Sequence, residues 1–136
     1  MPNPPKIDPQ RGARGRGVVN LPAEGRKAPA PEWPFSEFTL DEAEAWGQLW
    51  ATPQAVAWER LGWVRTVARY CRVMLAAEAA NATPALLAQA TAMEDRLGLT
   101  PKAMRLLLWQ VVDDELTAKR AAKVVSGARG RIKAVG

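Results

Sequence analysis

Arg-Leu-Gly-Leu-Thr-Pro-Lys, at residues 96–102, describes the end of one helix and the start of the next. Gly98 can adopt the left-handed conformation that ends a helix. Thr100 can cap the following helix with its side-chain oxygen, and Pro101 suits the first turn of that helix. We therefore predict a tight corner between two helices at this point.

Two further Thr-Pro pairs, Thr52-Pro53 and Thr83-Pro84, repeat this signal. Together with Pro101 they contain every proline after residue 34. Because an α-helix tolerates proline only near its start, this distribution favours helices over strands in this part of the chain. We therefore predict an all-α domain with helices that start at these three points.

The other helical signals come from capping and from apolar periodicity. Thr39 and Glu42 have the spacing of a capping box, and apolar residues recur at helical intervals through the rest of the domain. The pattern predicts four to five helices. We expect the last to run from Pro101 to about Val125, because the acidic residues 113–115 suit the middle of a helix better than its C-terminal end.

The prolines also divide the chain into segments. Eight of the eleven lie between residues 2 and 34, mixed with glycine and charge, a composition typical of disordered segments. We predict a disordered basic arm over residues 1–34, a helical oligomerisation core over residues 35–125, and a flexible basic tail over residues 126–136.

The net charge of +5 is unevenly distributed along the chain. Residues 1–27 contain six basic and two acidic residues, residues 117–136 contain six basic and no acidic residues, and residues 28–116 carry a net charge of −5. Both ends contain the pentapeptide Gly-Ala-Arg-Gly-Arg, at residues 12–16 and 127–131. Glycine between arginines disfavours a helix and leaves the guanidinium groups free to reach phosphates. This composition predicts nucleic-acid-binding arms, with solubilising tails as the alternative.

A basic stripe is expected on one helix as well. Arg65, Arg69 and Arg72 have the i, i+4, i+7 spacing that places them on one side of a helix. Two uses remain open for them, contact with DNA and pairing with carboxylates. The carboxylates considered for such pairing are those of Glu59, Glu78 and residues 113–115. The candidate DNA-binding residues are Arg11, Arg14, Arg16, Arg26, Lys27, Arg65, Arg69, Arg72, Lys119, Arg120, Lys123, Arg129, Arg131 and Lys133.

The helix expected after Pro101 does not resemble a DNA-reading helix. Its only polar residues before Asp113 are Lys102, Arg105 and Gln110. A recognition helix presents polar side chains to base edges. We therefore expect this helix to pack against other protein surfaces.

Four consecutive apolar residues in the same helix indicate self-association. Leu106, Leu107, Leu108 and Trp109 would occupy every side of one helical turn. The folded part is small, and six tryptophans are many for its core to bury. We predict that these four residues form an oligomer interface. The alternative is a central helix in a monomeric bundle.

The sequence lacks the features of most enzyme sites. It contains no histidine, hence no imidazole base, and no Gly-Lys-Ser/Thr loop for nucleotide phosphates. Residues 113–115 lack a second cluster of ligands for a metal site, and we expect Cys71 to be buried rather than nucleophilic. We therefore expect a non-catalytic protein with no cofactor and no metal.

No stretch approaches the roughly 18 uninterrupted apolar residues of a membrane span. The first residues contain proline, asparagine and lysine instead of the apolar core of a signal peptide. We therefore expect a cytoplasmic protein with no membrane partner.

Three segments carry a resemblance to a known family. They read Leu-Trp-Ala-Thr-Pro-Gln-Ala at residues 49–55, Val-Ala-Arg-Tyr at 67–70, and Met-Glu-Asp-Arg-Leu-Gly-Leu-Thr-Pro-Lys-Ala at 93–103. These segments resemble the small terminase subunits of tailed double-stranded-DNA bacteriophages, over roughly residues 40–115. The third segment is the most specific. One departure is Met104, where relatives commonly carry arginine, with Arg105 one place later.

The resemblance implies a non-enzymatic protein that assembles into a ring and binds double-stranded viral DNA at the packaging start site. It implies that the ring passes the DNA to a large terminase subunit, which carries the ATPase motor and the nuclease, and that it regulates that subunit. It also implies a location in the host cytoplasm and absence from the mature virion.

Two alternatives to this function remain open. One is a helical nucleic-acid-binding regulatory protein with Arg/Gly-rich arms and no packaging role, for which a monomer or dimer is expected. The other is a structural adaptor of the virion, which would be present in purified particles.

Overall fold

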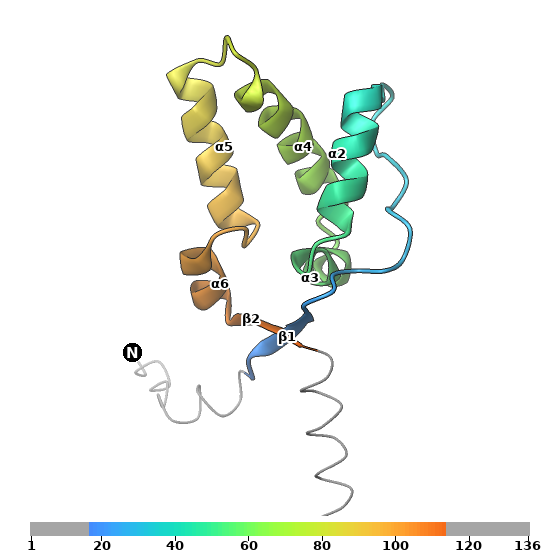
Figure 1. The fold of residues 1–136 in the computed structure, drawn as a ribbon, viewed down its shortest axis with the longest axis vertical. Helices are drawn as coiled ribbons and strands as arrows, with labels where there is room; N and C mark the ends of the chain where they lie inside the picture. Colours follow the sequence, from blue (N-terminus) through green and yellow to red (C-terminus); the bar gives the residue numbers. More distant parts are fainter. Residues whose placement is uncertain (1–16, 114–136) are drawn as a thin grey trace, which may run out of the picture.

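The computed structural model describes residues 17–113 of the chain, which are mostly helical. The helices are α2 (Leu40–Trp50), α3 (Gln54–Leu61), α4 (Val64–Glu78), α5 (Pro84–Arg96) and α6 (Pro101–Leu107), and the strands are β1 (Val19–Pro22) and β2 (Trp109–Val112). Helix α4 packs against both α2 and α5 (Figure 1). The two strands form a small parallel sheet at the end of the body where α3 and α6 lie (Figure 1).

The helix starts agree closely with the capping signals. The hydroxyls of Thr39, Thr83 and Thr100 accept hydrogen bonds from the backbone N–H three residues later, at 3.1–3.2 Å. Each of these bonds satisfies an N–H at the start of a helix, at α2, α5 and α6 respectively. Gly98 has a φ of +75°, so the predicted corner between α5 and α6 is confirmed.

Thr52 behaves differently from the other Thr-Pro threonines. Its hydroxyl donates a hydrogen bond of 2.7 Å to the carbonyl of Leu49, in the last turn of α2. Helix α3 begins at Gln54 without a side-chain cap. The Thr52-Pro53 pair therefore marks the predicted break in the chain, but its threonine stabilises the helix before the break.

The predicted disordered arm over residues 1–34 is too long. Residues 17–34 belong to the folded body, because Val19–Pro22 form β1 and the side chain of Leu21 is fully buried. Trp33 is also in the core. The start of the folded core at residue 35 is therefore wrong, since this proline-rich segment packs through a few large apolar side chains. Residues 1–16 lie outside the described part of the chain.

The prediction that the last helix runs to about Val125 is wrong. Helix α6 ends at Leu107, Leu108 adopts a left-handed conformation with a φ of +59°, and Trp109 begins β2. Residues 109–112 form backbone hydrogen bonds with β1 in place of those that a helix would supply. Tertiary contacts therefore override the local preference for helix. The all-α prediction is accordingly incomplete. Residues 114–136, including the predicted tail at 126–136, lie outside the described residues.

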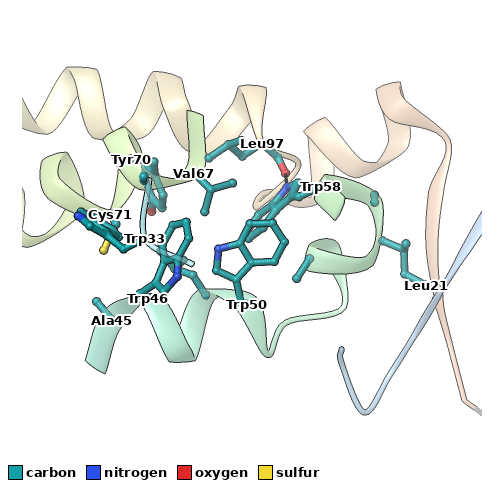
Figure 2. Packing of buried hydrophobic residues seen from close by; sticks show 14 of the residues in the cluster. Leu21, Trp33, Ala45, Trp46, Trp50, Trp58, Val67, Tyr70, Cys71 and Leu97 are labelled. Carbon is teal, nitrogen blue, oxygen red and sulfur yellow. Dashed lines mark hydrogen bonds between the residues drawn. The ribbon is translucent and has the colours of Figure 1, made fainter. Parts of the chain in front are cut away.

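Tryptophan side chains form much of the core. Trp33, Trp46, Trp50 and Trp58 make successive edge-to-face contacts, with ring centroids 5.0, 5.5 and 5.8 Å apart. Figure 2 shows the indole N–H of Trp58 directed at the carbonyl of Leu97, to which it donates a hydrogen bond of 2.9 Å. The buried tryptophans are Trp33, Trp46, Trp50, Trp58 and Trp109. One chain therefore buries five of its six tryptophans, and their number no longer argues for self-association.

Candidate nucleic-acid interface

The arginines of α4 have different environments, although they share one side of the helix. Arg72 donates hydrogen bonds to a carboxylate oxygen of Glu42 at 3.2 Å and to the carbonyl of Glu37 at 3.0 Å. Its guanidinium also lies over the rings of Trp33 and Phe35, at 5.3 and 4.9 Å from their centroids. These contacts tie the segment before α2 to α4, so Arg72 stabilises the fold and is not a free phosphate ligand.

Arg26 is a second candidate that the fold uses. Its side chain is only 9% exposed, and its guanidinium lies over Trp50 at 5.4 Å from the ring centroid. It donates to both carboxylate oxygens of Glu59, at 2.9 and 3.3 Å, and to the carbonyls of Ala28 and Pro29. Hydrogen bonding to Arg26 and its positive charge hold the pKa of Glu59 below the ordinary value. Arg26 is therefore not available to DNA in this fold.

Arg65 and Arg69 are exposed on the surface of α4, as the basic-stripe prediction requires. The guanidinium of Arg65 lies over Phe35, 5.4 Å from the ring centroid. Arg69 lines a hollow of about 300 Å³ between α4 and α5, together with Arg96. Lys27, in the segment before α2, is exposed as well.

Arg96 was missed as a candidate because its position in the sequence marks the end of a helix. The hollow that it shares with Arg69 has an apolar wall formed by Val73, Met93 and Leu97. A pattern of basic residues on one helix cannot reveal a neighbour from another helix. In three dimensions Arg69 and Arg96 border the same hollow and form, with Arg65, the candidate interface of the folded body.

The ion pairs of residues 17–113 leave these three arginines without a carboxylate partner. The salt bridges in this part of the chain join Arg26 to Glu59 and Arg72 to Glu42. Intramolecular pairing, one of the two uses left open for the α4 stripe, therefore applies to Arg72, although with a carboxylate that the sequence analysis did not consider. Exposed guanidinium groups without a carboxylate partner can contact phosphates directly.

The four residues predicted as an oligomer interface lie on different elements. Trp109 is buried on β2, with its ring centroid 6.2 Å from that of Trp63, and Leu107 packs against the core. Leu106 and Leu108 are 77% and 42% exposed. The argument from a single all-apolar helical turn is wrong, because α6 ends within this stretch. Of the four, only Leu106 and Leu108 are exposed and offer apolar surface to a second molecule.

The polar residues near α6 are separated in the same way. Lys102 and Arg105 are exposed on this helix, whereas Gln110 lies on β2. A helix of seven residues offers little surface to a DNA groove. The expectation that this segment packs instead of reading bases stays a prediction.

The one cysteine has the environment of a core residue, as predicted. Cys71 is fully buried, and burial raises the pKa of its thiol to about 11. The thiol is therefore protonated near neutral pH and is a poor nucleophile. Among residues 17–113, no group of three or more His, Cys, Asp or Glu side chains is placed to hold a metal ion.

The remaining nine candidates belong to the two ends of the chain. They are Arg11, Arg14, Arg16, Lys119, Arg120, Lys123, Arg129, Arg131 and Lys133, and all lie outside the described residues.

No helix within residues 17–113 is both long and apolar enough to cross a membrane. No protein family, curated protein or solved structure matches this chain.

Changing Arg65 and Arg69 together to glutamine is expected to weaken DNA binding and to reduce its dependence on salt. Each lost phosphate contact should reduce the slope of log K against log salt by about 0.9. Fluorescence anisotropy with a labelled duplex at several salt concentrations measures this slope.

Arg60→Gln is the matched control, because Arg60 is an exposed arginine of α3 outside this interface. It should leave the slope unchanged. Equal slopes for the wild type, the double variant and the control would show that α4 does not contact DNA.

Proposed function

We propose that this protein is the small terminase subunit of a tailed double-stranded-DNA bacteriophage. It binds viral DNA at the packaging start site as a ring oligomer, and it recruits and regulates the large terminase subunit with its ATPase and nuclease. It is not itself an enzyme. It acts in the host cytoplasm and is absent from the mature virion.

The observation that carries this proposal is the agreement between the resemblance and the folded body. The resemblance covers roughly residues 40–115, and the helices and the second strand occupy Leu40 to Val112. Its most specific segment, residues 93–103, spans the corner between α5 and α6. There Trp58 binds the carbonyl of Leu97, and Gly98 has the left-handed conformation. The most specific segment of the resemblance therefore coincides with this corner.

The small sheet supports a role in DNA binding for the two basic ends. Residues 1–16 precede β1 by two residues, and residues 114–136 follow β2 after Asp113. Because β1 and β2 are paired in parallel and four residues long, the two attachment points lie at opposite ends of a sheet roughly 13 Å long. Both Gly-Ala-Arg-Gly-Arg sequences are therefore connected to one region of the body. In an oligomer, many weak phosphate contacts from these ends add through avidity.

The division of tasks between the two subunits is what the family resemblance implies, and the described residues are compatible with it. Exposed arginines can bind phosphates, whereas the buried thiol of Cys71 is protonated near neutral pH. The resemblance assigns ATP hydrolysis and DNA cleavage to the large subunit. The small subunit contributes DNA binding, assembly and regulation.

Removing six basic charges from the two ends is expected to weaken DNA binding while the oligomer remains intact. The variant carries glutamine at Arg11, Arg14, Arg16, Arg129, Arg131 and Lys133 and leaves residues 17–113 unchanged. Six lost charges should lower the salt slope by up to about 5, and so reduce affinity at low salt by orders of magnitude. Anisotropy titrations measure affinity, and light scattering measures the mass of the oligomer.

Three outcomes would contradict the proposal. An unchanged salt slope would remove the basic ends from the DNA site. A monomer or dimer in light scattering, and no closed ring in electron micrographs with or without DNA, would favour the regulatory protein. A large subunit whose ATPase activity does not respond to this protein would exclude a role in packaging. A pull-down of the large subunit by the glutamine variant separates docking from DNA binding.

A further inference from the structure

The backbone hydrogen bonds of the sheet show which groups of β2 point away from β1. The N–H of Val19 donates to the carbonyl of Leu108 at 2.8 Å, and that of Ala23 donates to the carbonyl of Val112 at 2.9 Å. In a parallel pair the backbone groups of alternate residues face the partner strand. The N–H and C=O of Val111 therefore face the opposite side, at the outer edge of β2.

The outer edge of β1 is closed to a further strand. Because Val19 and Ala23 direct their N–H groups toward β2, the intervening Pro22 occupies a position that faces outward. Proline has no N–H, and on edge strands it prevents the addition of another strand. The sheet can therefore grow only at β2.

The open edge of β2 is also apolar. Val111 is 40% exposed on this strand, and Leu106 and Leu108 lie exposed just before it. Parallel sheets are normally covered, and a sheet of two strands has little stability of its own. A third strand at this edge would pair the free backbone groups and cover apolar side chains.

We propose that the outer edge of β2 binds the same edge of a second copy of this chain. The two β2 strands run antiparallel across a two-fold axis, and Val111 of each copy exchanges both backbone hydrogen bonds with Val111 of the other. The result is a four-stranded sheet in the order β1-β2-β2-β1. The inference rests on the self-association in the proposed function and does not require DNA.

Two features favour a second copy as the partner. The sequence of β2, Trp-Gln-Val-Val, contains no charged side chain, so two identical edges meet without repulsion. The joined sheet would carry Pro22 at both of its outer edges, which stops further growth. An isologous contact of this kind closes on itself, whereas contact between β2 of one copy and β1 of another is blocked by proline.

The test uses Val111→Pro in the full chain. This change removes the outward N–H and leaves the hydrogen bonds to β1 in place. We expect the wild type to contain an even number of chains, and the variant to contain at most half that number by light scattering at equal concentration. Asn20→Pro is the matched control, because Asn20 faces outward on the closed edge of β1 and is exposed. Its mass should equal that of the wild type.

A second variant and a second measurement test the same contact without requiring that the strand accept a proline. Val111→Lys leaves the backbone unchanged and places a charge at the edge, so it should lower the mass in the same way. In the wild type, hydrogen exchange at the Val111 amide should slow as protein concentration rises.

The inference is overturned by an odd number of chains, or by a folded Val111 variant with unchanged mass. Protection of Val111 that does not depend on concentration would assign the edge to another segment of the same chain. Weak DNA binding with the expected masses would count against the proposed function alone.

Discussion

Replacing Gly25 by alanine is expected to lower the free energy of unfolding by about 3 kcal/mol or more, because backbone strain adds to a steric clash. Gly25 is buried and has a φ of +82°, a conformation that side chains other than glycine rarely adopt. A Cβ atom at this position would overlap the carbonyl oxygen of Ala51, at the end of α2. The backbone at Ala51 cannot move aside as a flexible side chain can. The segment that contains Gly25 would therefore have to move away from the end of α2. Urea unfolding followed by tryptophan fluorescence measures the loss.

Gly62→Ala separates the two causes. Gly62 has a similar φ of +73°, but no atom lies within 4 Å of the position of a Cβ. Only backbone strain should appear, at roughly 1 kcal/mol. If Gly25→Ala cost no more than Gly62→Ala, residues 17–34 would not pack against the end of α2 as described.

Trp58→Ala is expected to lower the free energy of unfolding by about 3–5 kcal/mol, because a large buried side chain leaves a cavity. Trp58 is fully buried between Trp50, with ring centroids 5.8 Å apart, and the chain at Leu97. A domain of this size has a total stability of roughly 5–15 kcal/mol, so much of the protein would be close to unfolding. Thermal and urea unfolding measure the change.

Trp58→Phe tests the contribution of the hydrogen bond, because it keeps most of the side-chain volume and removes the indole donor. It keeps an aromatic ring in the core but leaves the carbonyl of Leu97 without its indole donor, which costs about 1–3 kcal/mol. The loss should be smaller than for alanine and larger than for a surface change. A loss below about 1 kcal/mol for Trp58→Ala would contradict the central position of Trp58 in the core.

The helix starts could be predicted because their causes are local. A cap joins Thr39, Thr83 or Thr100 to an N–H only three residues away, so neighbouring residues contain all the information required. Gly98 likewise ends α5 through its own conformational freedom. The same local logic failed at Thr52, because its hydroxyl could bond to the helix before it or to the one after it.

The candidate site could be predicted only in part. The spacing of Arg65, Arg69 and Arg72 placed them on one side of α4. It could not show that Glu42, Trp33 and Phe35 surround Arg72, whereas Arg69 shares a hollow with Arg96 from α5. Arg26 likewise lost its predicted role to Glu59 and Trp50. Whether an arginine is free for DNA depends on which carboxylates and rings other elements bring to it.

The sequence by itself determined the helices of the body, the corner at residues 96–102 and the uneven distribution of charge, since these depend on residues close together in the chain. Only the tertiary structure decided that residues 17–34 belong to the body and that the chain leaves α6 as a strand. Val19 pairs with Trp109, 90 positions later in the sequence. Hydrogen bonds between such distant segments, and the burial of Leu21 and Trp109 that accompanies them, outweigh the local preference for helix or disorder.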